Sequence, residues 1–139
     1  MSSTPLIDYR TNVPLDLDAM IELYRSSSLG DRRPIADRDR MRRMRDEANL
    51  CVTAWRGEQL VGIARTLTDF AYVAYLSDLA VDGACQRQGI GRALIDRTRA
   101  ELDPKCMIVL LAAPKAVEYY PKVGFTRHES AWILRPEST

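Results

Sequence analysis

The feature that most constrains the fold is an apolar run that leads into a glycine-rich turn and then into a helix-periodic segment. Leu79-Ala80-Val81 ends the apolar run, and Gly89 and Gly91 stand where the helical spacing begins. Glycine lets the backbone bend tightly and lets a ligand approach without meeting a β-carbon. The first turn of a helix presents unpaired N–H groups and the positive end of the helix dipole. The sequence therefore predicts a strand–loop–helix cradle for a phosphate group.

Two arginines, Arg87 and Arg92, add positive charge to this cradle. The run lacks the Lys-Ser or Lys-Thr that ends a mononucleotide P-loop, and it holds one Gly-x-Gly instead of the longer dinucleotide-binding pattern. Both of those nucleotide motifs are therefore excluded. A Gly-x-Gly at a helix start also occurs in ordinary turns, so the ligand has to be inferred from the rest of the chain.

Length and charge indicate one globular domain. The 139 residues suffice for a single core, and we treat 1–139 as one domain. Twenty basic and nineteen acidic side chains leave a net charge of +1, which predicts neither a nucleic-acid nor a membrane partner. Three widely spaced cysteines and a single histidine argue for a reducing compartment and against a metal site. Without a membrane-spanning stretch or a signal-peptide pattern, the expected location is the cytoplasm.

Hydropathy patterns predict an α/β domain. Asp16 and Asp37 are expected to cap two helices, and Arg56-Gly57-Glu58-Gln59 is expected to join two strands. The predicted order is strand, two helices, three strands, helix, strand, helix and two short strands. This order gives a mixed, strongly twisted sheet of about six to seven strands flanked by about four helices. The expected elements cover 6–10, 17–24, 35–49, 50–55, 60–67, 72–81, 90–102, 106–113, 115–123, 125–127 and 131–135.

Two motifs in this order resemble those of the GNAT superfamily of N-acetyltransferases. Gln86-x-x-Gly89-x-Gly91 is similar to the family loop whose backbone amides hold the pyrophosphate of acetyl-coenzyme A. The segment 116–125 resembles the family's Ala-x-x-aromatic-Tyr-x-Lys-x-Gly-Phe pattern. The resemblance covers about residues 6–135, and it implies the GNAT fold with acetyl-coenzyme A as cosubstrate.

The resemblance also implies how the cosubstrate binds. In the family, coenzyme A lies between the fourth and fifth strands where they splay apart. Its pantetheine arm would bind the backbone of Leu79, Ala80 and Val81, and an amide there would meet the thioester oxygen. The residues implied in pyrophosphate binding are Arg87, Gln88, Gly89, Ile90, Gly91 and Arg92.

The family chemistry is direct attack of a primary amine on the acetyl thioester, which requires proton transfer from the amine and to the departing thiolate. Tyr120 matches the tyrosine that many members use as general acid, and a packing role against the coenzyme tail is the alternative. Tyr119 lies one residue before the position of the general-acid tyrosine and is expected in the core. Ala113 stands where many relatives carry an asparagine that contacts the coenzyme, so that anchor is missing here.

The general base is harder to assign. Some members carry a glutamate at the position that is Tyr75 here. Asp78 is the nearest carboxylate, and it is either a base or a hydrogen-bonded structural acid. A bulge in the strand would change the face of the sheet on which its side chain lies. Asp69 is a candidate for the acceptor mouth or an ordinary turn residue. A base acting through water, or an amine that arrives neutral, stays open.

The leading hypothesis is an acetyl-coenzyme A-dependent N-acetyltransferase, with a small-molecule amine as the favoured acceptor. The alternatives are a protein or peptide N-acetyltransferase and a non-catalytic acyl-coenzyme A-binding regulatory module. A homodimer is left open, and the sequence does not identify the acceptor.

Overall fold

The computed structural model describes residues 6–136 and contains one five-stranded sheet in the order β1-β2-β3-β4-β5. Neighbouring strands are antiparallel from β1 to β4, whereas β4 and β5 are parallel. The elements are β1 (Asp8–Thr11), α1 (Leu17–Ser26), η1 (Gly30–Arg32), α2 (Arg38–Glu47), β2 (Leu50–Arg56), β3 (Gln59–Thr68), β4 (Val73–Val81), η2 (Gly83–Cys85), α3 (Ile90–Ala100), β5 (Met107–Val109), η3 (Pro114–Ala116) and α4 (Tyr119–Lys122).

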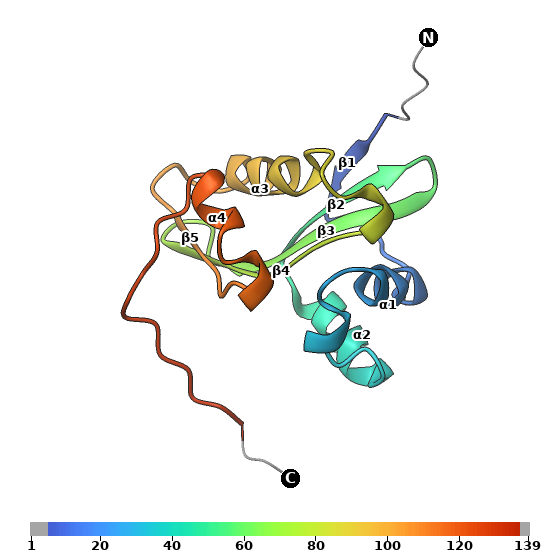
Figure 1. Ribbon diagram of the computed structural model, residues 1–139, viewed down its shortest axis with the longest axis horizontal. Coiled ribbons are helices and arrows are strands. Elements are labelled where there is room, and N and C mark those ends of the chain that lie inside the picture. The colour runs from blue at the N-terminus through green and yellow to red at the C-terminus, as the bar shows by residue number, and fades with distance from the viewer. Residues whose placement is uncertain (1–5, 137–139) are drawn as a thin grey trace.

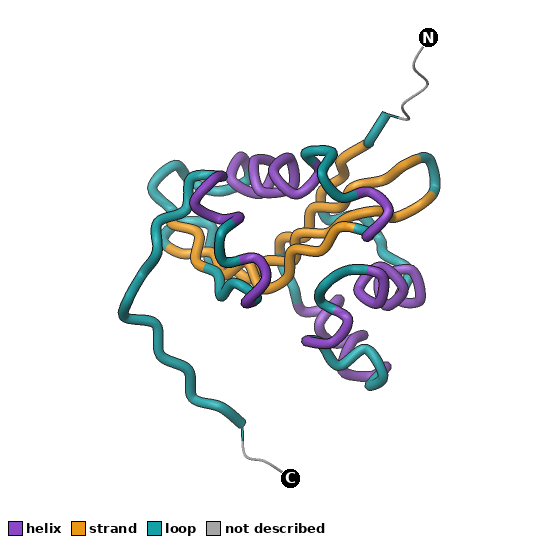
Figure 2. Tube along the Cα trace, in the orientation of Figure 1, coloured by secondary structure: helices purple, strands orange, loops and turns teal. Residues whose placement is uncertain are grey.

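The sheet forms the middle layer of the molecule. In Figure 1, α3 and α4 lie above it and α1 and α2 lie below it, and Figure 2 shows the strands as one twisted layer between helices. Each face buries a separate core. The α3-side core contains Leu50, Val52, Ala54, Val61, Ala64, Ala74, Leu76, Cys85, Ile90, Leu94, Ile95, Leu102 and Cys106. The α1–α2-side core contains Leu17, Met20, Ile21, Leu23, Tyr24, Leu29, Met41, Leu60, Ile63 and Ala80.

The expected caps and the hairpin are confirmed. The Asp16 carboxylate accepts a hydrogen bond from the N–H of Ala19 at 2.9 Å, and Asp37 accepts one from Arg40 at 3.2 Å. These side chains satisfy N–H groups that the first helical turn leaves free. The turn between β2 and β3 contains Gly57 at φ +61°, a conformation that favours glycine.

The prediction of six to seven strands is wrong for the part of the chain that the structure describes. The segments 125–127 and 131–135 form no strands, and β5 is shorter than the expected 106–113. The expected helix over 115–123 is divided into η3 and α4. Alternating apolar residues form a strand only when they pair with another strand, and residues 126–136 do not pair although the outer edge of β5 has no strand partner among the described residues. Residues 126–136 instead lead away from the sheet (Figure 1), and the side chain of Trp132 is 94% exposed.

The ladder between β3 and β4 contains a bulge at Ser77. Arg65 on β3 stands opposite Asp78, and the next residue on β3, Thr66, stands opposite Leu76. Ser77 is therefore skipped in the register. An extra residue of this kind bends the strand and shifts its side chains by one position.

The bulge changes the face on which the side chains of β4 lie. Before it, Leu76 belongs to the α3-side core, and after it Leu79 and Val81 pack against that same core. Asp78 and Ala80 turn to the opposite face, where Ala80 joins the α1–α2-side core. A regular strand would have placed Leu76 and Leu79 on opposite faces.

Candidate functional site

The sheet opens between β4 and β5. The two strands pair over only three residues each, from Val73 opposite Met107 to Tyr75 opposite Val109. Beyond Tyr75, the edge of β4 that faces β5 has no strand partner among residues 6–136. An unpaired strand edge offers backbone N–H and C=O groups to an extended ligand. The predicted coenzyme residues Leu79, Ala80 and Val81 lie on this part of β4.

The segment after β4 is held in place by Asp82. Its N–H donates to the carbonyl of Val61 on β3 at 2.9 Å, and its carboxylate accepts from the N–H of Ala84 at 2.9 Å. The N–H of Cys85 donates to the Asp82 carbonyl at 2.8 Å, and the Cys85 side chain is buried. These bonds fix the path by which β4 leads into the glycine loop.

The glycine loop has the backbone that its sequence predicts. Arg87 and Gly89 have φ values of +65° and +81°, and Gly89 caps α3. The N–H of Ala93 donates to the Gly89 carbonyl at 3.0 Å. The N–H groups of the turn before Ala93 have no carbonyl below them within the helix, so they point out of its N-terminus. A β-carbon on Gly89 would meet nothing within 4 Å, so the space beside this residue is open.

Gly91 leaves room for the hydroxyl group of Tyr119. A β-carbon at this position would lie 2.9 Å from the hydroxyl oxygen of Tyr119, closer than real contacts of this kind. Tyr119 therefore packs directly against the first turn of α3. Sequence reasoning assigned Tyr119 to the core and missed this contact, although the pairing of a helical glycine with a downstream aromatic residue was a usable signal.

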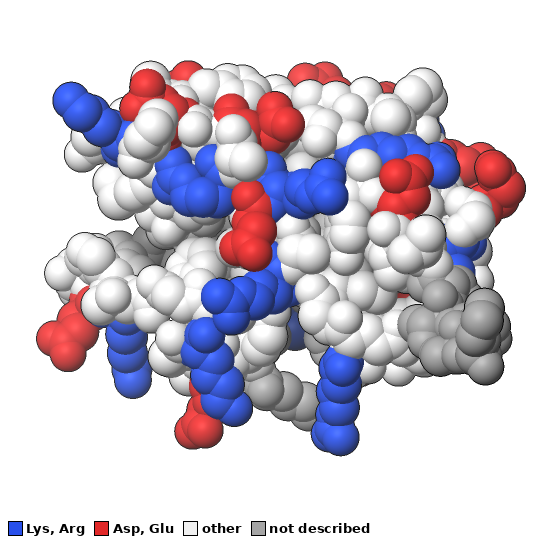
Figure 3. Space-filling model, turned by 90° about the horizontal axis from the view of Figure 1, so that it is seen from above, with Lys and Arg blue, Asp and Glu red and all other residues white. Residues whose placement is uncertain are grey.

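The predicted pyrophosphate residues differ in exposure. Arg87, Gln88, Gly89 and Arg92 are exposed, whereas the side chain of Ile90 is buried in the α3-side core. Only the backbone of Ile90 is therefore available to a ligand. Seen from the α3 side, lysine and arginine side chains form a band across the molecule, with acidic side chains beside them (Figure 3).

Tyr120 lies on α4 in an aromatic cluster. Its ring centroid is 5.3 Å from that of Tyr119 and 5.5 Å from that of Phe125, both in edge-to-face geometry. Burial raises the pKa of Tyr120, the neighbouring Tyr119 raises it further, and the positive charge of Arg33 opposes this rise. The phenol is therefore protonated at neutral pH and can donate its proton.

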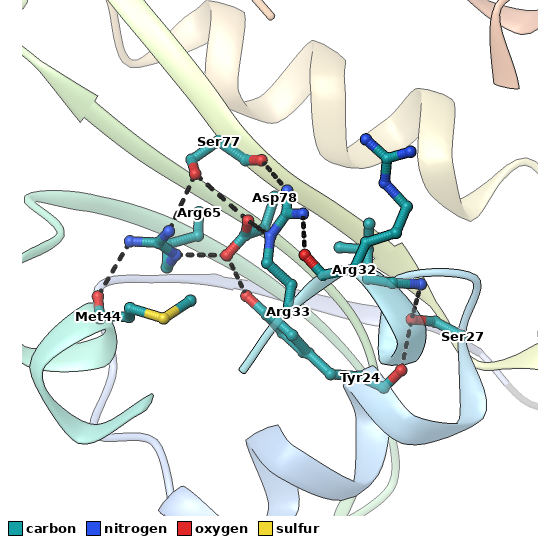
Figure 4. A network of polar contacts seen from close by, with 9 residues as sticks. Tyr24, Ser27, Arg32, Arg33, Met44, Arg65, Ser77 and Asp78 are labelled. Carbon is teal, nitrogen blue, oxygen red and sulfur yellow. Dashed lines mark hydrogen bonds and ion pairs between the residues drawn. The ribbon is translucent and has the colours of Figure 1, made fainter. Parts of the chain in front are cut away.

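Asp78 is surrounded by donors (Figure 4). Its carboxylate accepts hydrogen bonds from the Tyr24 hydroxyl at 2.6 Å, from Nε of Arg65 at 2.5 Å and from Nε of Arg33 at 2.6 Å. Burial raises the pKa of Asp78, but the Arg65 charge and the bonds from Arg65 and Tyr24, with the Arg33 charge, outweigh it and hold the pKa below its ordinary value. This carboxylate is ionised, and both of its oxygens accept hydrogen bonds from neighbouring side chains.

The same two arginines hold the bulge. One terminal nitrogen of Arg33 donates to the Ser77 carbonyl at 2.7 Å, and one of Arg65 donates to the Ser77 hydroxyl at 2.9 Å. Arg65 also donates to the carbonyl of Met44 on α2 at 3.1 Å. The sequence offered a clue for Arg65, because an arginine within an apolar strand needs a partner, but it offered none for Arg33.

Asp69 is a turn residue. Its carboxylate accepts from the N–H groups of Ala71 at 3.0 Å, Tyr72 at 2.8 Å and Val73 at 3.2 Å. These backbone hydrogen bonds lower the pKa of Asp69. The carboxylate therefore shapes the turn into β4.

Within residues 6–136, no group of three or more His, Cys, Asp and Glu side chains is arranged to hold a metal ion. No helix in this range has the length and apolar character that crossing a bilayer requires.

Residues 33–133 match the acetyltransferase (GNAT) domain. The chain belongs to the GNAT family. Solved structures show the same fold: an acetyltransferase of the GNAT family from Streptococcus pneumoniae superposes with a TM-score of 0.72 at 21% identity, over 94% of this chain and 100% of that one. The aminoglycoside N-acetyltransferase AAC(6')-Iy, solved in complex with CoA, superposes with a TM-score of 0.73 at 15% identity, over 99% of both chains. The predicted α/β GNAT fold is confirmed.

Curated relatives of this GNAT domain carry several different activities in their names. The histone acetyltransferase TAP1 of Glycine max is 37% identical over 70 residues, which are 49% of this chain and 30% of that protein. The chloroplastic serotonin N-acetyltransferase 2 of Oryza sativa subsp. japonica is 28% identical over 131 residues, which are 88% of this chain and 62% of that protein. The chain thus spans less than two thirds of these relatives.

Proposed function

We propose that this GNAT domain is an acetyl-coenzyme A-dependent N-acetyltransferase that transfers the acetyl group directly to a primary amine. The observation that carries the proposal is the continuity of the site. The open edge of β4 leads, through the segment fixed by Asp82, into the N-terminus of α3, while Tyr119 packs against that N-terminus from α4. An extended donor with a diphosphate fits such an arrangement along its whole length.

The donor is proposed to bind mostly through the backbone. Leu79, Ala80 and Val81 would pair with the amides of the pantetheine arm, as an added strand would. The exposed Arg87 and Arg92 would add charge to the free N–H groups of 87–92 around the diphosphate.

In the proposed reaction, the amine nitrogen attacks the thioester carbonyl and the carbon–sulfur bond breaks. The nitrogen loses a proton, and the departing thiolate gains one. Tyr120 is the proposed proton donor, because its phenol is held protonated at neutral pH and its ring packs against the α3-side core beside Tyr119, which contacts the first turn of α3.

We assign no side chain as the general base. Asp78 is proposed as a structural acid instead, because its carboxylate is fully buried and accepts bonds from four side chains, those of Tyr24, Arg33, Arg65 and Ser77. The amine is then deprotonated by water or arrives neutral.

A small-molecule acceptor is favoured by the name of one relative: the protein that matches 88% of this chain is named a serotonin N-acetyltransferase. A protein or peptide acceptor is the second candidate, because one relative is named a histone acetyltransferase. A non-catalytic acyl-coenzyme A-binding module is the third.

The decisive experiment measures acetylated product by mass spectrometry with acetyl-coenzyme A and a panel of amines. The panel contains indole ethylamines, aminoglycosides, polyamines and histone-tail peptides. Acetylation of a small amine supports the leading proposal, and acetylation of peptides alone supports the second candidate. Tight coenzyme binding without any acetylated product would leave only the regulatory module.

The first prediction concerns Tyr120. Tyr120→Phe removes the proton donor but keeps the ring, so kcat is expected to fall by about 100-fold, in the range typical of a lost general acid. Tyr72→Phe is the matched control, because Tyr72 is 67% exposed. An unchanged kcat for Tyr120→Phe over the full pH range would contradict the acid role.

Two other features belong to the proposal. The cytoplasm is the proposed location, because Cys51, Cys85 and Cys106 are unpaired thiols that suit a reducing compartment. The rice relative is named as chloroplastic, so fractionation of the source cells is the direct test. A homodimer is the proposed assembly, because the apolar side chains of Trp132 and Leu134 are almost fully exposed.

A further inference from the structure

Arg33 joins the segment before α2 to the bulge of β4 (Figure 4). Its Nε donates to Asp78 at 2.6 Å, one terminal nitrogen donates to the Ser77 carbonyl at 2.7 Å, and the other donates to the carbonyl of Arg32 at 2.9 Å. The side chain is 20% exposed, so the guanidinium is largely shielded from water. One planar group therefore connects two backbone segments that lie far apart in the sequence.

The bond to Ser77 has a specific structural consequence. Ser77 is skipped in the ladder with β3, and a bulge leaves backbone groups that need another partner. Arg33 supplies a donor to its carbonyl. Because the bulge decides that Leu79 and Val81 face the α3 side, Arg33 supports the geometry of the strand edge proposed to bind the donor.

Arg33 and Arg65 differ in what they hold. Arg65 lies on β3 opposite Asp78, within the ladder of the sheet. Arg33 comes from the connection between α1 and α2, which is not part of the sheet. If Arg33 is lost, Asp78 still has Arg65 and Tyr24 as partners, so the fold can persist while the connection and the bulge are released.

The positive charge of Arg33 also acts on the proposed proton donor. It lowers the pKa of Tyr120, against the effects of burial and of Tyr119, which raise it.

We propose that Arg33 is a positioning residue of the acetyl-transfer site, which fixes the Ser77 bulge and the segment before α2 relative to the edge of β4 that is proposed to bind the donor. The proposal rests on the proposed function. It predicts that removing the guanidinium impairs transfer more than it impairs donor binding, because the glycine loop that would hold the diphosphate is untouched and only the alignment of the pantetheine arm along β4 is loosened.

The test compares Arg33→Met and Arg33→Lys with the control Arg32→Met, in which the neighbouring exposed arginine is changed. Calorimetry measures the dissociation constant for acetyl-coenzyme A, steady-state kinetics separate kcat from KM, and circular dichroism checks folding. For Arg33→Met we expect binding within about threefold of the parent and a kcat lower by about ten- to hundredfold, as for a misplaced reacting group. Arg33→Lys should recover only part of kcat, since an ammonium cannot bridge both acceptors as the planar guanidinium does.

A second readout does not depend on activity. Tyrosine labelled with ¹³C reports the titration of Tyr120, with Tyr120→Phe used to assign the signal. The pKa of Tyr120 should rise in Arg33→Met and stay unchanged in Arg32→Met, because a neighbouring positive charge is removed only in the first. Hydrogen exchange should also increase at the amides of residues 77–81 in Arg33→Met alone.

The outcomes separate the two proposals. An inactive parent protein that still shows the titration and exchange changes would contradict the proposed function and support the assignment of Arg33. A folded Arg33→Met protein with the parent kcat, or an Arg32→Met protein with an equal loss, would overturn the assignment. If Arg33→Met does not fold, Arg33→Lys and Arg33→Gln provide the same comparison.

Discussion

Asp78 carries a negative charge at a position where its side chain is fully excluded from water. Two guanidinium groups and one phenol compensate for the lost hydration. Burying such a charge is costly unless it is paired, and removing one partner leaves the others uncompensated. The network is therefore a condition for a buried, charged carboxylate at this position of the sheet.

The second prediction follows from that network. Asp78→Asn should lower the free energy of unfolding by about 3–5 kcal/mol, because Arg65 and Arg33 lose their counter-ion. The control is Asp39→Asn, whose side chain is 86% exposed and whose pair with Arg42 lies on the surface. Urea titration measures both, and an equal loss in the two variants would contradict the role of the buried network.

The third prediction is that the same network makes the free energy of unfolding depend on pH. The pKa of Asp78 is lower in the folded chain than in the unfolded one, so its contribution is fully present above the unfolded pKa of about 4. That contribution is lost as the pH falls below about 4 through the folded pKa. Urea midpoints measured from pH 7 to pH 3 should therefore fall less steeply for Asp78→Asn than for the parent, whereas a parallel decline would contradict the prediction.

At the scale of elements, the junction between β4 and α3 follows directly from the sequence. The Leu-Ala-Val run, the two glycines and the apolar helical spacing all describe local structure, which neighbouring residues determine. The splay of β4 from β5 and the bulge at Ser77 depend on pairing between distant segments. Arg33 and Arg65 reach Asp78 over 45 and 13 residues, so no local pattern could reveal these partners.

The fourth prediction concerns the loop. Gly89→Val should raise the dissociation constant for acetyl-coenzyme A, because a branched side chain would occupy the open space at the N-terminus of α3. Gly57→Val is a matched control: it also replaces a glycine of positive φ with nothing within 4 Å, but it lies in the hairpin between β2 and β3. Both variants should lose similar stability, and calorimetry should detect weaker binding only in Gly89→Val. Equal binding by the two would contradict the assignment of the cradle.

At the scale of the molecule, the expected final hairpin does not form and apolar side chains stay uncovered. Trp132 and Leu134 are 94% and 99% exposed, and Met107 and Val109 on β5 are 48% and 41% exposed. Sequence alternation identified the C-terminal residues as suited to a strand, but a strand forms only through pairing, and in the described part of the chain these residues leave the outer edge of β5 unpaired. Uncovered apolar surface of this kind is typical of an interaction surface.

The fifth prediction is that the chain forms a homodimer through these side chains. Size-exclusion chromatography with light scattering should give twice the chain mass for the parent. Trp132→Ser combined with Leu134→Ser should shift the protein towards the monomer, because it removes apolar area from the contact. The control Tyr72→Ser changes an exposed aromatic residue outside the C-terminal segment. A parent protein that is monomeric at every concentration would contradict the prediction.

The bulge at Ser77 also restricts how β4 can change in length. Deleting Ser77 would restore a regular ladder in which Leu76 and Leu79 still face the α3-side core and Asp78 still faces away from it, although Arg33 and Arg65 would lose the Ser77 carbonyl and hydroxyl as partners. Inserting or deleting one residue elsewhere in β4 would instead reverse the faces of the side chains on one side of the change. In an alignment of GNAT domains that keep the Asp78 carboxylate, we therefore expect a one-residue gap within β4 only at the position of Ser77, and other gaps in the turns on either side of the strand.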